Sequence, residues 1–262
     1  MMQGKVVILT GASEGIGRAL AQQLSGQGAK LVIAARDQAR LTSLAEALPG
    51  EALVCPCDVA KASQCQSVID AALAHFGRID VLICNAGMTM WSRFDALQQS
   101  DVLQRLMQVN YLGAVFMTQA ALPALKQSRG HLVAVASVAG LTGVPERSGY
   151  AASKHAVVGF FESLRIELLG SGVDVTQLCP DFVLTETHRR AIGADGQPLG
   201  DSPMQEGKIM TAQKCAVLMH RAIERRQRLW LGSWRARLGR WVKLLAPGWI
   251  DRITARAITQ RH

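Results

Sequence analysis

Residues 5–28 read KVVILTGASEGIGRALAQQLSGQG, and this stretch decides how the rest of the chain can fold. Its first six residues form a short apolar run rich in β-branched side chains, which predicts a buried strand. Gly11, Gly15 and Gly17 follow, and after them apolar residues recur with helical spacing. A glycine-rich turn between a strand and a helix brings backbone N–H groups and a helix N-terminus against a phosphate. The stretch therefore predicts a phosphate-binding turn, although tight turns without a ligand also need glycine.

The alternation of strand and helix continues along the chain. Apolar runs predict further strands over residues 30–36, 52–60, 80–87, 130–137 and 173–180. Helical patterns lie between them, over 37–48, 61–76, two helices within 96–126, and 150–170. Such alternation implies a parallel sheet with helices on both faces and a ligand site at the carboxyl ends of its strands. We therefore predict an α/β fold, a Rossmann-type doubly wound parallel sheet in a single domain over residues 1–232.

Length, composition and charge fit this class. The 262 residues suffice for one α/β domain or at most two small ones, and 49% of them are hydrophobic. The net charge of +9 is unevenly placed. Residues 1–213 hold 17 Lys and Arg against 18 Asp and Glu, whereas residues 214–262 hold 12 against 2. The basic character therefore belongs to the C-terminal part rather than to the domain.

The sequence shows neither a targeting signal nor a metal motif. The N-terminal residues lack the charged region, apolar run and cleavage site of a signal peptide, and no stretch reaches ~18 apolar residues. We therefore expect a cytoplasmic protein. Cys55 and Cys57 share one face of a predicted strand, but no second pair with zinc spacing follows. We expect reduced, buried thiols and no metal site.

Tyr150 and Lys154 stand four residues apart at the start of a predicted helix, so their side chains share one helical face. An ammonium beside a phenol favours the phenolate and lowers the phenol pKa from its ordinary value near ~10. Ser137 ends the apolar run before this helix. A hydroxyl delivered beside a Tyr–Lys pair makes a proton-transfer site with a second hydrogen-bond donor. Alone, the Tyr-x-x-x-Lys pair is a weak motif, because such helical pairs are common by chance.

Four further motifs accompany this group in one order. TGASEGIG lies at 10–17, NAG at 85–87, Asn110 within QVNYLGA, and PDFVLT at 180–185. Together the motifs are highly specific, and over roughly residues 4–232 the chain closely resembles the classical short-chain dehydrogenases/reductases (the SDR family). The resemblance implies an oxidoreductase that acts on a carbonyl or a secondary alcohol with a nicotinamide dinucleotide. It implies a catalytic set of Asn110, Ser137, Tyr150 and Lys154.

The roles of this set follow from the same resemblance. Tyr150 would exchange a proton with the substrate oxygen, and Ser137 would orient that oxygen through a hydrogen bond. Lys154 would lower the tyrosine pKa and hold the nicotinamide ribose. Asn110 would hold a helix bend and a water that connects the lysine to solvent, which would explain a poor helix former inside a helix.

The resemblance also implies a set of cofactor-binding residues. Asp58 would meet the adenine edge with Val59 beside it, although an Asp at this place is nearly as well explained as the N-cap of helix 61–76. Asn85, Ala86 and Gly87 would line the adenosine ribose. The complete set is Gly11, Ser13, Gly15, Ile16, Gly17, Arg36, Asp58, Val59, Asn85, Ala86, Gly87, Tyr150, Lys154, Pro180, Val183 and Thr185.

The end of the second strand indicates which dinucleotide is bound. NAD-binding relatives usually place an acidic residue there for the ribose 2′-hydroxyl, but this chain has Ala35 followed by Arg36. A guanidinium suits a 2′-phosphate, and Arg40 could assist it. Asp37 could compete, or it could cap helix 37–48. NADP(H) is therefore the predicted cofactor, and NAD(H) is the alternative.

The segment after the sixth predicted strand departs from the family pattern. The family usually has Pro-Gly here, whereas Pro180 is followed by Asp181. Asp is less free than Gly in its backbone angles and adds a charge near the site. Val183 and Thr185 still match the residues that hold the nicotinamide carboxamide. Residues 186–210 show little periodicity, and we interpret them as a mobile substrate loop.

The C-terminal segment 233–262 is predicted to contain a basic amphipathic helix over 234–245. Arg240 and Lys243 fall opposite its apolar face, which carries Trp234, Leu238, Trp241 and Leu245. Three interpretations stay open: a helix in a membrane interface, a contact between subunits, or a helix folded onto its own domain. Nucleic-acid binding is disfavoured, because the tryptophans lie on the apolar face and no nucleic-acid-binding fold is recognised.

These observations predict an NADP(H)-dependent enzyme that interconverts a ketone and a secondary alcohol, on a hydrophobic substrate such as a lipid or a steroid. A homo-oligomer, a dimer or tetramer, is expected from the family. If the tail is a helix in a membrane interface, we expect it to bind the protein to the inner face of the membrane. The alternatives are an NAD(H)-linked alcohol dehydrogenase, an epimerase or dehydratase of the same fold, or a non-catalytic nucleotide-binding scaffold.

Overall fold

The computed structural model describes residues 2–201 and 209–259. Part of the predicted substrate loop, residues 202–208, therefore lies outside the described residues, as do Met1 and the last three residues of the predicted tail. Two short strands stand at the two ends of that loop, β7 (Val183–Leu184) before it and β8 (Met210–Thr211) at its close, and they pair with each other in parallel.

The described residues form a seven-stranded sheet in which every neighbouring pair of strands is parallel. The strand order is β3-β2-β1-β4-β5-β6-β9. The chain builds the sheet from β1 outward to β3 at one edge, and then crosses back to place β4 on the other side of β1. This order confirms the predicted doubly wound sheet. Its strands are β1 Val6–Thr10, β2 Lys30–Ala35, β3 Ala52–Pro56, β4 Val81–Cys84, β5 His131–Val135, β6 Asp174–Cys179 and β9 Leu229–Leu231.

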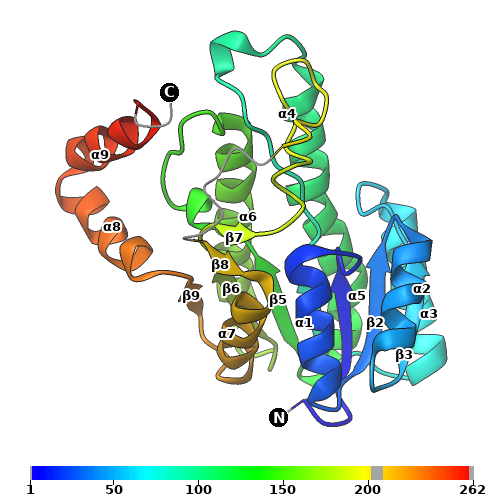
Figure 1. Ribbon diagram of the computed structural model, residues 1–262. Coiled ribbons are helices and arrows are strands. Elements are labelled where there is room, and N and C mark those ends of the chain that lie inside the picture. Colours follow the sequence, from blue (N-terminus) through cyan, green and yellow to red (C-terminus); the bar gives the residue numbers. More distant parts are fainter. Residues whose placement is uncertain (1, 202–208, 260–262) are drawn as a thin grey trace.

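Helices cover both faces of the sheet (Figure 1) and bury a separate core on each. Successive strand residues point to opposite faces, so Ile8 joins the core under α3, α5 and α6, whereas Val7 and Leu9 join the core under α1, α2 and α7. The strands are thus buried on both sides, which is why they are continuous apolar runs in the sequence. The helices are α1 Gly15–Gly26, α2 Gln38–Ala47, α3 Ala62–Phe76, α5 Gly113–Ser128, α6 Ser148–Glu167 and α7 Ala212–Glu224.

The segment predicted as two helices within 96–126 does contain two α-helices, but Asn110 lies in a π-helical turn between them and not inside the second. A single helical run begins as α4 (Asp101–Leu106), passes through a π-helical turn over Met107–Leu112 and continues as α5. A separate 3₁₀ turn, Phe94–Ala96, precedes it. Asn110 lies in the π-helical turn, where the wider backbone changes the direction in which side chains point.

The edge strand β9 was not predicted from the sequence. It has three residues and pairs with β6 through Leu229, Trp230 and Leu231. Beyond it the chain forms α8 (Trp234–Leu245) and α9 (Pro247–Thr259), which lie to one side of the sheet in Figure 1. None of the helices within the described ranges is long and apolar enough to cross a membrane.

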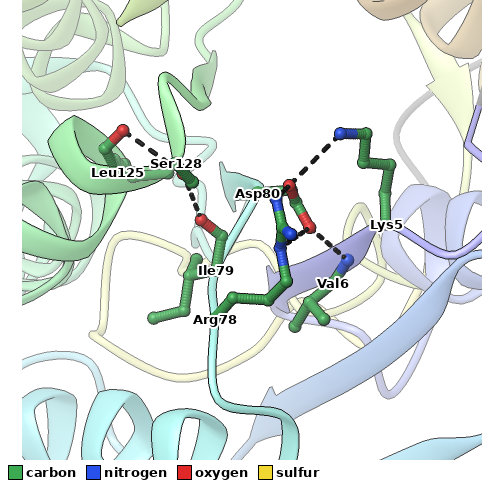
Figure 2. A network of polar contacts seen from close by, with 7 residues as sticks. All are labelled: Lys5, Val6, Arg78, Ile79, Asp80, Leu125 and Ser128. Carbon is green, nitrogen blue, oxygen red and sulfur yellow. Dashed lines mark hydrogen bonds and ion pairs between the residues drawn. The ribbon is translucent and has the colours of Figure 1, made fainter.

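A buried carboxylate ties together the amino ends of β1 and β4 (Figure 2). Asp80 is 4% exposed and accepts hydrogen bonds from the Val6 N–H at 3.0 Å, from Arg78 Nη2 at 2.6 Å and from Lys5 Nζ at 3.3 Å. Burial favours the neutral acid, but the bonds from Val6 and Arg78 and the charge of Lys5 outweigh it and hold the pKa of Asp80 below its ordinary value. This network lies at the amino ends of the parallel strands, opposite the carboxyl ends that the glycine turn follows.

Asp80→Asn is expected to lower the melting temperature at neutral pH by about 2–8 °C, because it removes a charged acceptor worth about 1–3 kcal/mol. The pKa of the folded state lies below the unfolded value of about 3.9. The stabilisation is therefore present above about pH 4 and is lost as the pH falls through the folded pKa. Thermal unfolding from pH 7 to pH 3 measures both effects. Asp95→Asn, which removes the exposed ion pair with Arg93, is the control, and equal shifts for the two variants would contradict this role.

Candidate active site

The turn between β1 and α1 has no room for side chains. Gly11 has a φ of 67°, and a Cβ atom there would lie 2.8 Å from the Cα of Ala86. A Cβ atom on Gly17 would lie 2.0 Å from the carbonyl oxygen of Gly11. Both positions therefore require glycine. The N-cap of α1, Glu14, makes no side-chain hydrogen bond to the helix, so the N–H groups of the first turn are left for a bound anion.

Hydrogen bonds fasten the Asn85–Gly87 segment to this turn. The Thr10 hydroxyl accepts from the backbone N–H groups of Asn85 and Ala86, each at 3.0 Å. The Asn85 side-chain amide donates in return to the carbonyl oxygens of Thr10, at 3.0 Å, and Gly11, at 3.2 Å. The two predicted motifs are thus one unit. The Asn85 side chain holds the backbone of the glycine turn, and the Thr10 hydroxyl holds the backbone of the Asn85–Gly87 segment. Sequence reasoning did not single out Thr10.

The residues after β2 settle how Asp37 is used. Its carboxylate accepts the Arg40 backbone N–H at 3.0 Å and so caps α2, as one of the two predicted roles required. The Arg40 side chain bonds Asp37 at 3.2 Å and Glu14 at 2.7 Å, and Arg190 reaches the same Glu14 carboxylate at 2.6 Å. Arg36 is exposed, and no hydrogen bond or ion pair to its side chain occurs within residues 2–201 and 209–259.

Asp58 and Val59 lie just beyond β3. The Asp58 carboxylate accepts the Ala60 N–H at 3.1 Å, within the connecting turn. The N-cap of α3 is Lys61, so the alternative prediction that Asp58 caps this helix was wrong. Val59 is buried and packs where a Cβ atom on Gly113 would approach to 2.7 Å. The connection after β3 thus holds Asp58 and Val59 at the carboxyl ends of the strands, where the glycine turn also lies.

Tyr150 and Lys154 lie in the first two turns of α6, beside the end of β5. The Lys154 ammonium donates to the Val135 carbonyl oxygen at 2.9 Å and lies 5.9 Å from the centre of the Tyr150 ring. Ser137 follows β5, and its hydroxyl, which accepts the Ala139 N–H at 3.2 Å, acts to lower the pKa of Tyr150. The structure therefore brings the predicted hydroxyl, phenol and ammonium together.

The ionisation of Tyr150 reflects opposing influences. Burial favours the neutral phenol, but the positive charges of Lys154 and Arg147 and the Ser137 hydrogen bond outweigh it, so the pKa of Tyr150 lies below its ordinary value. The neighbouring thiol of Cys179 is buried, and burial raises its pKa to about 12, so it stays neutral near pH 7. The phenol is therefore prepared to exchange a proton nearer neutrality than a free tyrosine.

Asn110 uses its side chain to hold backbone. Its Oδ1 accepts the Met88 N–H at 2.7 Å, and its Nδ2 donates to the Met88 carbonyl oxygen at 3.0 Å and to the Ser153 hydroxyl at 2.9 Å. A Cβ atom on Gly87 would lie 3.2 Å from Asn110 Oδ1 and 3.6 Å from Lys154 Nζ. Asn110 therefore joins the segment after β4 to α6 next to the lysine, which accounts for an asparagine inside a helix.

The segment after β6 closes the site from the other side. The Pro180 carbonyl oxygen accepts the Val138 N–H at 3.1 Å, so it adjoins the Ser137 turn. Val183 begins β7, and the Thr185 methyl group lies 3.2 Å from where a Cβ atom on Gly15 would be. Thr185 therefore stands beside the start of α1.

Asp181 connects this segment to the C-terminal part. Its Oδ2 accepts the Ser233 hydroxyl at 2.6 Å and its Oδ1 accepts the Phe182 N–H at 2.9 Å. Ser233 is also the N-cap of α8, where its oxygen accepts the Ala236 N–H at 3.1 Å. The charge that Asp181 adds near the site is thus hydrogen-bonded to the start of the tail.

One cavity of about 1260 Å³ runs from the glycine turn to Tyr150. All the predicted site residues line it except Gly15, which faces Thr185, and Asn110, which lies behind Met88. Its size, the side-chain-free turn and the uncapped helix N-terminus fit a nicotinamide dinucleotide together with a substrate.

Among the charged residues of this cavity that sequence reasoning did not single out, Arg147 is the buried one closest to Tyr150. Arg147 is 5% exposed and lies at the N-cap of α6, with its guanidinium 4.3 Å from the centre of the Tyr150 ring. Its Nη2 donates to the Thr89 hydroxyl at 2.6 Å. An arginine in a polar segment normally indicates an exposed side chain, so nothing local to Arg147 predicted its burial.

The cysteines are buried and carry no disulfide within the described ranges. No group of three or more His, Cys, Asp or Glu side chains suited to a metal ion occurs among the described residues.

Comparison with known proteins agrees with this geometry. A family model described as short chain dehydrogenase matches residues 5–194. The chain is 35% identical over 237 residues to 11-beta-hydroxysteroid dehydrogenase 1A of Arabidopsis thaliana, covering 87% of this chain and 68% of that protein.

Two solved structures are similar. A short chain dehydrogenase/reductase from Burkholderia phymatum in complex with NAD has a TM-score of 0.79 and 30% identity, over 91% of this chain and 92% of that one. An alcohol dehydrogenase from the archaeon Thermococcus sibiricus complexed with 5-hydroxy-NADP has a TM-score of 0.77 and 25% identity, over 87% and 96%.

Proposed function

This chain belongs to the short-chain dehydrogenase family, and on that premise we propose that it is an NADP(H)-dependent oxidoreductase that interconverts a ketone and a secondary alcohol. The observation that carries the proposal is the Tyr150 phenol, with the Lys154 ammonium 5.9 Å from the centre of its ring and Ser137 lining the same cavity. This group shares one cavity with the glycine turn. A proton donor and a nucleotide site therefore open into the same space.

The dinucleotide would be held by backbone and side chains along this cavity. The glycine turn and the N-terminus of α1 suit its phosphates, the Asp58 turn suits the adenine, and the segment from Pro180 to Thr185 suits the carboxamide. When bound, the nicotinamide supplies or accepts the hydride. The protein residues supply orientation and the proton.

The proton passes through Tyr150. In the reduction direction its hydroxyl donates the proton to the substrate oxygen, which Ser137 orients by a second hydrogen bond. The phenolate that remains is stabilised by the nearby cations of Lys154 and Arg147. In the oxidation direction the phenolate removes the hydroxyl proton. Asn110 keeps the segment after β4 in place beside Lys154.

A hydrophobic substrate is supported by the walls of the cavity near Tyr150. Met88, Trp91, Val144 and Phe182 line it there. The similarity to 11-beta-hydroxysteroid dehydrogenase 1A supports a substrate of steroid or lipid size. An apolar wall contributes affinity in proportion to the apolar area that the substrate removes from water.

Tyr150→Phe is expected to lower kcat at least about hundredfold while leaving NADPH binding intact, because it removes the proton donor and keeps the ring. Reduction of a panel of hydrophobic ketones, followed by NADPH absorbance, measures the first effect, and thermal shift with NADPH measures the second. Tyr111→Phe is the control, because the Tyr111 ring packs edge-on against Phe160. A Tyr150→Phe variant that retains most activity would refute the assignment.

The same panel addresses the other functions. A scaffold without turnover would bind the dinucleotide and convert no ketone. An epimerase or dehydratase would change the substrate without a net change in NADPH absorbance.

NADP(H) is favoured by the residues after β2. Asp37 already caps α2 and contacts Arg40, so its carboxylate is engaged, whereas the exposed Arg36 guanidinium lines the cavity. A guanidinium donates charge-assisted hydrogen bonds to a 2′-phosphate, which NAD(H) lacks.

Arg36→Gln is expected to weaken NADPH binding about 10- to 100-fold and to leave NADH binding nearly unchanged. Thermal-shift titration with each dinucleotide measures the change. Arg225→Gln, an exposed arginine at the end of α7, controls for the loss of one charge. Tighter binding of NADH than NADPH by the unaltered protein would show that NAD(H) is the cofactor.

We further propose that residues 1–232 are the catalytic domain and that residues 233–262 are a tail that contacts an anionic lipid surface. Helix α8 has no acidic residue, and Ala236 is its buried residue. Its large apolar side chains and those at the start of α9 are exposed, namely Trp234, Leu238, Trp241, Leu244, Leu245, Trp249 and Ile253. Interfacial helices combine basic residues with Trp and Leu in this way.

The double variant Trp241→Ser, Trp249→Ser is expected to bind anionic phosphatidylglycerol vesicles at least about tenfold more weakly, because two interfacial anchors are lost. Co-sedimentation measures binding, and Leu169→Ser, which removes an equally exposed side chain on the body of the protein, is the control. If the variant binds vesicles normally but dissociates an oligomer in light scattering, the tail is a subunit contact.

A further inference from the structure

Arg147 is a cation held inside the proposed active site. Its guanidinium carbon lies 4.3 Å from the centre of the Tyr150 ring, 5.2 Å from that of Trp91 and 5.7 Å from that of Phe182. The side chain is 5% exposed. The three rings come from α6, from the segment after β4 and from the segment after β6, so the guanidinium is enclosed on several sides.

The chain fixes Arg147 from both directions. The residue before it, Glu146, has a φ of 61°, a left-handed conformation that is unfavourable for a residue with a side chain. This conformation is held by hydrogen bonds from Trp91 Nε1 to the Glu146 carboxylate at 2.8 Å and from the Ser92 N–H to the Glu146 carbonyl oxygen at 2.8 Å. On the other side Arg147 Nη2 donates to the Thr89 hydroxyl. Contacts with distant segments of the chain therefore fix the position of the guanidinium.

A cation on the ring of a phenol acts on its ionisation. It attracts the negative face of the neutral ring, and it attracts a phenolate more strongly because the full charge is then present. The Arg147 guanidinium lies nearer the ring centre than the Lys154 ammonium does, at 4.3 Å against 5.9 Å. The charge of Arg147 therefore adds to that of Lys154, which has the larger effect on the ionisation of the phenol.

The other groups around Tyr150 do not supply this effect. Ser137, after β5, carries a neutral hydroxyl, and Cys179, at the end of β6, is a neutral thiol near pH 7. The Glu146 carboxylate beside Arg147 is bonded to the Trp91 indole. His188, on the segment after β7, also feels the charge of Arg147, and burial lowers its pKa, so it is neutral near pH 7.

We propose that Arg147 is a positioning residue for Tyr150: its guanidinium, packed on the phenol ring, holds the ring in place and favours the phenolate, so that two cations set the proton transfer. The inference rests on the proposed function, in which Tyr150 exchanges the proton. It concerns a role outside the predicted set of Asn110, Ser137, Tyr150 and Lys154.

The chain offers a direct measurement of this effect, because it contains two tyrosines, Tyr111 and Tyr150. In a Tyr111→Phe background, the ultraviolet absorbance of the phenolate reports Tyr150 alone, without turnover. Arg147→Met is expected to move this titration upward by about one pH unit or more, and Arg147→Lys to move it less. Arg225→Met, which removes an exposed arginine at the end of α7, is expected to leave it unchanged.

The pH dependence of kcat/KM supplies the second readout. In alcohol oxidation the rate rises with pH as the phenolate forms, so a higher tyrosine pKa moves this rise to higher pH. In ketone reduction the rate falls as the phenol ionises, and that fall moves in the same direction. The thermal shift produced by NADPH is expected to be unchanged, because Arg147 contacts Tyr150 and not the glycine turn.

Separate outcomes decide the inference and the proposed function. If Arg147→Met titrates as the unaltered protein does, or shifts no further than Arg225→Met, the inference is overturned. If Arg147→Met fails to fold, Thr89→Val, which removes the hydroxyl that anchors Nη2, provides the test, and an unshifted titration overturns the inference. If Tyr150→Phe keeps its activity, the proposed function fails whatever the Arg147 variants show.

Discussion

The site depends on one close approach, that of the β1–α1 turn to the end of β4. Gly11 and Gly17 have no space for a Cβ atom, and the bonds between Thr10 and Asn85 close the remaining gap. Because the turn is this tight, α1 begins directly at the carboxyl end of β1, where the N-cap side chain leaves its first N–H groups uncapped and Ile16 and Gly17 line the cavity. The parallel sheet then delivers the ends of its other strands to the same edge. A looser turn would leave the cavity without its phosphate end.

Much of this arrangement was predictable because the controlling features are local in sequence. Strands buried on both faces are continuous apolar runs, and the residues that follow them fall at one edge whatever the details of packing. The position of Ser137 beside Tyr150 and Lys154 follows from this rule and from helical spacing. The choice between two roles for Asp37 did not follow, because it depended on whether a carboxylate oxygen reaches the Arg40 N–H, which the structure places at 3.0 Å.

The features that sequence reasoning missed are set by contacts between distant segments. Arg147 is buried because Trp91 and Phe182, far from it in the chain, come to lie around it. The π-helical turn at Asn110 is stabilised by hydrogen bonds to the Met88 backbone. Helix propensity identifies asparagine as a poor helix former but does not reveal that Met88 is its partner. The strand β9 has three residues and depends on pairing with β6. In each case the decisive energy is tertiary and leaves no periodic pattern in the sequence.

The departure from Pro-Gly at Asp181 follows from the same dependence on distant contacts. A glycine could not accept the Ser233 hydroxyl, and the chain supplies Gly232 just before that serine, where a Cβ atom would lie 2.8 Å from the Asp181 backbone nitrogen. At the other end of α8, Lys243 donates to the Leu141 carbonyl oxygen at 2.7 Å. Helix α8 is therefore attached at its start to the segment after β6 and near its end to the segment after β5. Both segments border the cavity, so the charge at position 181 contributes to the placement of α8 beside it.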